Sequence, residues 1–201
     1  YVSPGWVDLR SHFGDPGMEH LEELKTGAAA AAAGGFTHVG ILPDTDPWIA
    51  NKSQVTYLKD KARQLPISLL PLATISKPDQ PNELTEMLDL ANAGVQVFTQ
   101  GDRSIADADF LKRAMQYVSA FGGRLMLYPQ LAGLHEGGQM NEGITNIQLG
   151  LTGTPAMAEH IAIQRDIELC RYTGARIHFS KVTSARSLQF IAAARQEALP
   201  I

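Results

Sequence analysis

The side chains with the greatest chemical potential follow short apolar runs of the sequence. His12 follows one run, Lys181 follows another, and Arg10 lies two residues before His12. An imidazole can bind a metal ion or move a proton, and an amine can form a Schiff base with a carbonyl substrate. His12 could equally be a histidine hydrogen-bonded at a strand end, and Lys181 could be an ion-pair partner. These residues alone leave the chemistry open.

A hydrolytic metal site needs several neutral imidazoles or carboxylates that converge on one point. The positions after the apolar runs are polar, but they include cations and few carboxylates. They are Arg10, His12, Gly14, Pro43, Asp44, Thr45, Thr74, Ser76, Gln100, Asp102, Tyr128, Gln130, Ser180 and Lys181. Only His12 clearly qualifies as a ligand. We expect His178 to belong to the core and His160 to be exposed or to cap a helix.

Six short apolar runs alternate with six longer amphipathic segments. The expected strands are Trp6–His12, His38–Pro43, Ser68–Ile75, Val95–Thr99, Arg124–Tyr128 and Arg176–Val182. The expected helices are Glu19–Ala33, Lys52–Leu65, Asn82–Asn92, Asp107–Ala120, Pro155–Tyr172 and Ala185–Ala198. This alternation predicts a parallel sheet with right-handed crossovers, and functional residues at the carboxyl ends of its strands.

The pattern leaves two α/β architectures open. Six units predict a TIM-type (β/α) barrel whose later units are absent from this chain, or else a self-contained open sheet. Leu199–Ile201 reads as the onset of a seventh strand. The glycine-rich stretch Pro129–Gly153 is long for a barrel loop. We expect it to cover the mouth or to contact a neighbouring chain.

Composition argues against several classes of partner. The 201 residues carry a net charge of −4 and contain no long basic run, so we expect neither nucleic acid nor an anionic membrane as a partner. Cys170 is the only cysteine, which excludes a disulfide within the chain and a cysteine metal cluster. This usage favours a reducing cytoplasm, and we expect Cys170 to be a small buried residue on a helix.

Five segments together resemble the sequence pattern of the dihydroorotase family of the amidohydrolase superfamily. Pro4–Gly17 resembles P-G-x-x-D-x-H-x-H-x-R-x-P-G, and Thr26–Thr37 resembles T-G-x-x-A-A-x-x-G-G-x-T. Leu42–Pro47 resembles M-P-N-T-x-P, Asn141–Gly143 resembles N-E-G, and Gly174–Ser184 resembles G-x-x-x-H-x-x-H-V-S. The resemblance spans essentially the whole chain. It implies the metal-dependent amidohydrolase barrel, with about six βα units in this chain.

The resemblance also implies that the metal-binding positions are degenerate. The first metal histidine of the family falls on Arg10, and the second is kept as His12. The strand-four ligand, a carbamylated lysine or an aspartate depending on the subclass, falls on Gln100. The strand-five histidine falls on Tyr128 and the strand-six histidine on Lys181.

Both visible substrate contacts of the family are replaced as well. The arginine that holds the substrate carboxylate falls on Gly14, and the substrate-binding asparagine falls on Asp44. An anionic dihydroorotate would therefore lose its cationic clamp and meet a carboxylate instead. The catalytic aspartate of the family falls beyond residue 201.

Elementary chemistry agrees with this comparison. Arg10 keeps its proton and has no lone pair for a metal, and Lys181 adds a second positive charge. Two cations about 4 Å from a divalent ion would each be repelled by several kcal/mol. We therefore expect no cofactor, although active relatives use zinc, and no metal-activated hydroxide. We also expect Arg10, His12, Tyr128 and Lys181 to share one layer, with Arg10 near the former metal position and balanced by Asp8, Asp44 or an anion.

Three functions fit these observations. The first is a non-catalytic, cytoplasmic dihydroorotase-like protein of pyrimidine biosynthesis, homo-oligomeric and an assembly partner of aspartate transcarbamoylase, with Leu131–Gly153 as the expected contact. The second is an active cyclic-amide hydrolase whose altered metal site uses His12 and residues outside this chain. The third is a Schiff-base lyase that uses Lys181.

Overall fold

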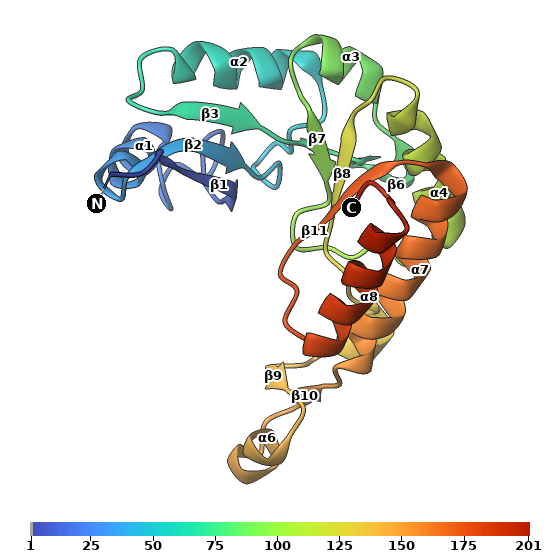
Figure 1. The fold of residues 1–201 in the computed structure, drawn as a ribbon. Helices are drawn as coiled ribbons and strands as arrows, with labels where there is room; N and C mark the ends of the chain where they lie inside the picture. Colours follow the sequence, from blue (N-terminus) through green and yellow to red (C-terminus); the bar gives the residue numbers. More distant parts are fainter. Residues whose placement is uncertain (1) are drawn as a thin grey trace. The chain divides into compact units, whose positions relative to one another are not determined.

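The structure, a computed structural model, describes residues 2–201 and divides into two compact units that meet in sequence between Gly101 and Asp102. In both, short strands alternate with helices along the chain (Figure 1). No helix of residues 2–201 combines the length and the apolar character that crossing a membrane requires.

The first unit contains two sets of parallel strands. Strands β1 (Trp6–Ser11), β2 (Phe36–Ile41) and β3 (Ser68–Pro71) form one sheet, and β4 (Ala73–Thr74) pairs with β7 (Val97–Thr99). An antiparallel hairpin of β5 and β6 follows β4. The remaining bounds are α1 (Leu24–Ala33), α2 (Lys52–Ala62), β5 (Ser76–Lys77), β6 (Gln80–Leu84) and α3 (Met87–Asn92).

The second unit pairs β8 (Arg124–Leu127) with β11 (Arg176–Phe179) in parallel. The backbone amide of Ile177 donates to the carbonyl of Pro200 over 3.0 Å, so the last residues lie beside β11, as the onset of a further strand would. The other elements are α4 (Ala108–Ser119), α5 (Ala132–His135), β9 (Met140–Asn141), α6 (Ile144–Leu149), β10 (Gly153–Thr154), α7 (Met157–Thr173) and α8 (Ala185–Gln196).

The alternation predicted from the sequence is confirmed, with corrections at four places. The strand expected over Ser68–Ile75 is interrupted at Leu72, because β3 pairs with β2 whereas β4 pairs with β7. The helix expected over Glu19–Ala33 begins only at Leu24, because the preceding residues form a closed turn. The helix expected over Asn82–Asn92 begins at Met87, because residues 80–84 form β6, where Glu83 pairs with Lys77 of β5. The expected loop Pro129–Gly153 is a folded excursion that contains α5, β9 and α6.

The helices of the second unit are joined mainly by apolar packing. Helix α4 buries Leu111, Ala114 and Val118, and α7 buries Ala162, Ile163 and Cys170. The burial of Cys170 confirms its expected role as a small core residue, and burial raises the pKa of its thiol to about 11. Cys170 is therefore chemically inert at neutral pH.

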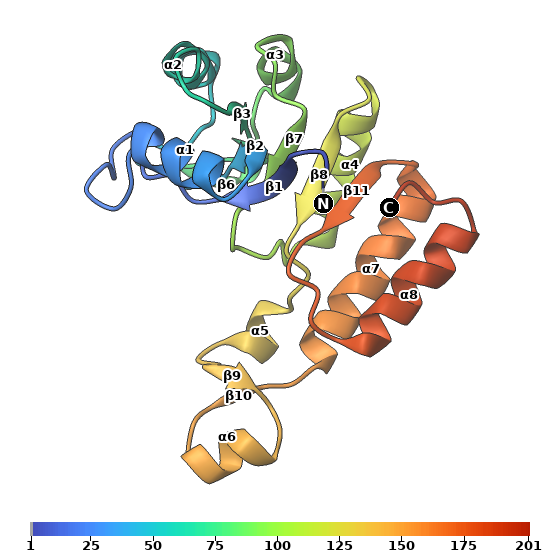
Figure 2. The same ribbon diagram turned by 60° about the vertical axis from the view of Figure 1, so that its left-hand side comes forward.

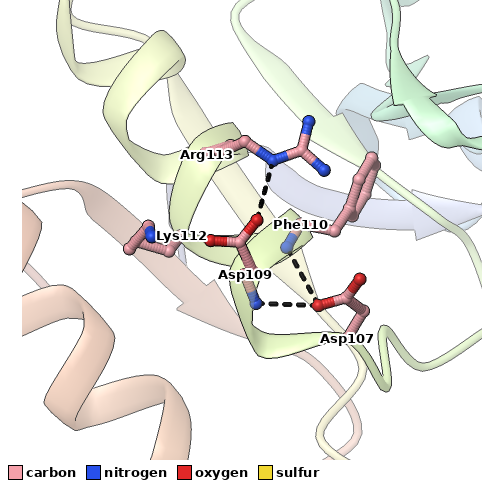
Figure 3. A network of polar contacts seen from close by, with 5 residues as sticks. All are labelled: Asp107, Asp109, Phe110, Lys112 and Arg113. Carbon is pink, nitrogen blue, oxygen red and sulfur yellow. Dashed lines mark hydrogen bonds and ion pairs between the residues drawn. The ribbon is translucent and has the colours of Figure 1, made fainter.

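Helix α4 has a charged but exposed beginning (Figure 3). Asp107 accepts hydrogen bonds from the backbone amides of Asp109 and Phe110, which fixes the first turn. Asp109 then pairs with Lys112 and Arg113 one turn later. The ion pair with Lys112 lowers the pKa of Asp109, but such exposed pairs contribute little to stability.

The loop after β1 closes around Gly14. The amide of Gly14 donates to the carbonyl of Glu22 over 2.9 Å, and the amide of Met18 donates to the carbonyl of Gly14 over 2.6 Å. A Cβ atom added at Gly14 would lie 2.0 Å from the carbonyl oxygen of Met18 and 3.1 Å from that of Glu22. Backbone atoms occupy that space, so this loop admits no side chain at position 14.

Helix α7 also carries a buried carboxyl group. Asp166 is 2% exposed and accepts from the guanidinium of Arg165 at 2.8 Å. Burial raises the pKa of Asp166 to about 6, although the charge of Arg165 lowers it. Arg165 also donates to the carbonyl of Ala106 over 3.1 Å, which ties α7 to the segment before α4.

We predict that Gly14→Ala destabilises the protein by about 1–3 kcal/mol, because the loop must shift away from the new methyl group. Thermal unfolding measures this loss. The matched control is Gly133→Ala, where an added Cβ meets no atom of the described chain within 4 Å. Equal melting temperatures for the two variants would contradict the closed loop.

We predict that Asp166→Asn alters how stability depends on pH. The pKa of Asp166 is about 6 in the folded state and 3.8 in the reference state, so its contribution is present at acidic pH and is lost as the pH rises through about 6. The variant should therefore gain up to about 3 kcal/mol over the parent protein between about pH 4 and pH 8. Denaturant unfolding at several pH values measures this gain. Asp109→Asn, at an exposed carboxylate, should not show it.

Candidate functional site

In the first unit, two of the expected site residues contact each other. His12 follows β1 and Asp44 follows β2, and Nε2 of His12 lies 3.1 Å from Oδ2 of Asp44. A carboxylate only accepts hydrogen bonds, so Nε2 must carry the proton in this contact. That nitrogen then has no lone pair for a metal ion. The side chain of Asp44 is 18% exposed and that of His12 is 55% exposed, so the pair lies at the surface of this chain.

Asp8 holds the backbone between Arg10 and His12. Its Oδ1 accepts from the backbone amide of Arg10 over 2.8 Å, and its Oδ2 accepts from the hydroxyl of Ser11 over 2.7 Å. Both carboxylate oxygens are therefore engaged in shaping the end of β1. This fixes the backbone from which the Arg10 side chain extends.

Gln100, which the resemblance aligns with the strand-four ligand of the family, is fully engaged in hydrogen bonds within the first unit. Its Oε1 accepts from the backbone amides of Ile75 and Ser76 over 2.9 and 3.2 Å, and from the hydroxyl of Thr74. Its Nε2 donates to the hydroxyl of Ser76 over 2.6 Å. Three donors saturate the amide oxygen, so Gln100 ties the end of β7 to the segment between β4 and β5 rather than presenting an oxygen to a metal.

In the second unit, Tyr128 and Lys181, two of the expected site residues, contact each other. The ammonium of Lys181 lies 5.6 Å from the ring centre of Tyr128 and forms an ion pair with Asp102. Lys181 adopts a left-handed backbone, with φ of 54°. The Tyr128 ring packs edge-on against His135, whose Nδ1 lies 3.1 Å from the hydroxyl of Thr154. The expectation that Lys181 is an ion-pair partner is therefore confirmed.

Glu159 anchors the loop that carries Lys181, and no pattern in the sequence pointed to this role. The buried carboxylate accepts from the amide and hydroxyl of Thr183 over 3.0 and 2.7 Å, and from the amide of Ser184 over 3.1 Å. Burial alone would raise the pKa of Glu159, but the hydrogen bonds, including those from Thr183 and Ser184, lower it. A charged carboxylate thus caps the start of α8.

The two remaining histidines of interest have local roles. His160 contacts the hydroxyl of Ser184 over 2.7 Å and packs edge-on against Phe190, so it supports the start of α8, as expected for a capping residue. His178 is half-buried in β11, and burial lowers its pKa. A neutral His178 fits the expected core position.

The structure brings the expected site residues together only within each unit. His12, Gly14, Asp44 and Gln100 belong to the first unit with Arg10, and Tyr128 and Lys181 belong to the second. The single layer expected for Arg10, His12, Tyr128 and Lys181 joins both units and stays a prediction.

The donor set does not fit a zinc ion. Within residues 2–201, no three histidine, cysteine, aspartate or glutamate side chains are grouped so that they could hold a metal. The guanidinium of Arg10 and the paired ammonium of Lys181 have no lone pair to offer. His12 and Gln100 keep suitable atoms, but the contacts described above engage them.

Comparison with known proteins identifies the family. The profile described as "Dihydro-orotase-like" matches residues 1–187. The chain is 35% identical over its whole length to a dihydroorotase of Carboxydothermus hydrogenoformans and 36% identical to one of Acetivibrio thermocellus. It covers 47% of each, so it spans about half the length of these relatives.

Solved structures agree on the fold. An L-hydantoinase (dihydropyrimidinase) from Arthrobacter aurescens matches 98% of this chain with a TM-score of 0.81 at 19% identity, and the match covers 46% of the hydantoinase. A dihydroorotase from Saccharomyces cerevisiae, solved with 5-fluoroorotic acid, matches 97% with a TM-score of 0.67 at 16% identity, and 52% of that chain is covered. The fold is thus part of a TIM-type (β/α) barrel. By its sequence profile and its full-length match to dihydroorotases, this chain belongs to the dihydro-orotase-like family.

Proposed function

We propose that this chain is part of a dihydroorotase-like protein of pyrimidine biosynthesis whose site holds no metal, and which serves in the cytoplasm as an assembly partner of aspartate transcarbamoylase. The observation that carries this proposal is the contact between His12 and Asp44. The histidine kept from the family's metal set donates its Nε2 proton to a carboxylate. That carboxylate stands where the family has a substrate-binding asparagine.

The proposed loss of metal binding is supported by the positive charges of Arg10 and Lys181 and by their lack of a lone pair for a metal. Arg10 and Lys181 bring positive charge to positions where the family has neutral imidazoles, and Tyr128 packs against Lys181 and His135. In the first unit, a zinc ion would have to displace the His12–Asp44 contact and tolerate the Arg10 guanidinium, which cannot act as a ligand. No zinc-activated hydroxide would then form.

The substrate side rests on the loop after β1. The family's arginine position is Gly14, and backbone atoms of Met18 and Glu22 fill the space that a side chain would need. A carboxylate substrate would therefore lack the arginine that binds it. Substituting Gly14 by arginine would not restore this contact, because the loop has no room for the side chain. Asp44 adds a negative charge where a dihydroorotate would lie.

The two alternative activities have less support. An altered hydrolase would need His12 to exchange its bond to Asp44 for a bond to the metal. A Schiff-base lyase would need Lys181 as a free amine, but its ammonium is paired with Asp102. An ammonium that donates to a carboxylate has no lone pair with which to attack a carbonyl. The retained barrel pattern favours a role for the shape or surface of the protein.

Co-expression with aspartate transcarbamoylase from the same source tests the partnership. We expect the full-length protein and the transferase to elute together as one large complex in size-exclusion chromatography. The transferase expressed alone should be wrongly assembled or weakly active, and addition of the purified dihydroorotase-like protein should restore it. Separate elution with a fully active transferase alone would contradict the proposed partnership.

We predict that rebuilding the ligand set restores some zinc affinity, and that releasing His12 from Asp44 increases it. The variant Arg10→His, Gln100→Asp, Tyr128→His, Lys181→His supplies the family's ligand types, and adding Asp44→Asn weakens the hold on His12. Calorimetric titration with zinc should show tighter binding when Asp44→Asn is present. Hydrolysis of dihydroorotate should stay absent, because Gly14 offers no clamp. Equal zinc affinity with and without Asp44→Asn would contradict the role given to Asp44.

A further inference from the structure

Helix α6 in the second unit buries a polar side chain and exposes its apolar ones, the reverse of the usual arrangement. Its buried side chain is that of Asn146, which is 9% exposed. Ile144, Ile147 and Leu149 of the same helix are 77%, 76% and 61% exposed, and Leu151 just after it is 37% exposed. A surface helix normally buries its apolar side chains and exposes its polar ones. Here the apolar side chains face outward, which is unfavourable unless something covers them.

The reversed helix belongs to a folded segment, residues 139–154, in which α6 connects the parallel strands β9 and β10. This segment, called the α6 hairpin below, is held by its own hydrogen bonds. The amide of Gly143 donates to Oδ1 of Asn146 over 2.6 Å, and Nδ2 of Asn146 donates to the carbonyl of Leu151 over 3.1 Å. Parallel pairing of β9 with β10 closes the base of the hairpin. In both views α6 extends away from α7 and α8 of its own unit (Figures 1 and 2). Its apolar side chains are therefore presented on a rigid support and are not merely loose.

The charge distribution around this hairpin is that of an interface. Between Arg124 and Arg165, residues 125–164 contain no lysine or arginine, although the whole chain has 17 such residues. The α6 hairpin itself carries one charged residue, Glu142. Lysine and glutamate are depleted at the centres of protein–protein interfaces, where burying a charge is costly. Further exposed apolar residues lie on the elements that flank the hairpin, namely Leu134, Met157 and Ile161.

We infer that the α6 hairpin docks against the same hairpin of a second copy of this protein. A nearly uncharged apolar surface is complementary to itself, because it needs no opposite charge on its partner and suffers little repulsion from a copy. In a two-fold contact every exposed side chain of the patch is used twice. Its apolar side chains offer on the order of several hundred Å² per copy, and a standard interface takes about 800 Å² from each partner.

This assignment gives the hairpin to a second copy and leaves another surface for a transcarbamoylase. It does not depend on the proposed loss of metal, because an active hydrolase could use the same contact. The tests below contain neither transcarbamoylase nor added zinc, so their outcome is separate from that of the proposed function.

Sedimentation equilibrium of the full-length protein tests the contact. We expect the parent protein to sediment as a dimer or a multiple of a dimer, and Ile144→Asp with Ile147→Asp to halve its mass. Tyr172→Asp is the matched control. Tyr172 is 74% exposed near the C-terminal end of α7, whereas the α6 hairpin precedes the N-terminal end, so this variant should keep the mass of the parent. A monomeric parent, or a double variant with the mass of the parent, would overturn the inference. Circular dichroism checks that the double variant keeps its helices.

Cross-linking gives a second test that requires no disruption. Ile147→Cys places a thiol in the patch, Tyr172→Cys places one outside it, and Cys170 is buried. A short bis-maleimide should yield a covalent dimer with Ile147→Cys far more efficiently than with Tyr172→Cys or the parent. Equal yields would overturn the inference.

Discussion

The hydrogen bond from His12 to Asp44 is the interaction on which the character of the first unit's site depends. It joins the ends of β1 and β2 and uses the Nε2 atom of the histidine kept from the family's metal set. It also places a carboxylate where a family member would bind its substrate. In the function that we propose, this one contact would weaken both metal binding and anion binding, because the Nε2 proton is donated to the carboxylate.

The neighbouring residues make this change coherent. The side chain of Gln100 accepts hydrogen bonds from the backbone between β4 and β5, and Gly14 lies where the loop leaves no room for a side chain. In the second unit, Asp102 and Tyr128 hold Lys181, and Glu159 anchors the loop that follows it. Each of these side chains is engaged in contacts that hold the local fold. This is the pattern expected of the metal-free site that we propose.

The sequence predicted the alternation of strands and helices because short apolar runs such as His38–Pro43 and helix ends such as Gly174 are local signals. It failed where tertiary contacts decide, namely in the closed loop around Gly14, in the β5–β6 hairpin and in the reversed helix α6. The replaced positions were identified by resemblance, but their partners were not. A glutamine at a strand end gives no sign that its amide will saturate two backbone donors, and Glu159 lies in a helix without any motif.

The metal content of the purified full-length protein tests the central claim most directly. The protein would be incubated with excess zinc, dialysed and analysed for bound metal, with a catalytically active dihydroorotase treated in parallel. The account predicts no stoichiometric zinc in this protein and a full complement in the active enzyme. One or more zinc ions per chain, lost on His12→Ala, would show that His12 is still a ligand and would contradict the account.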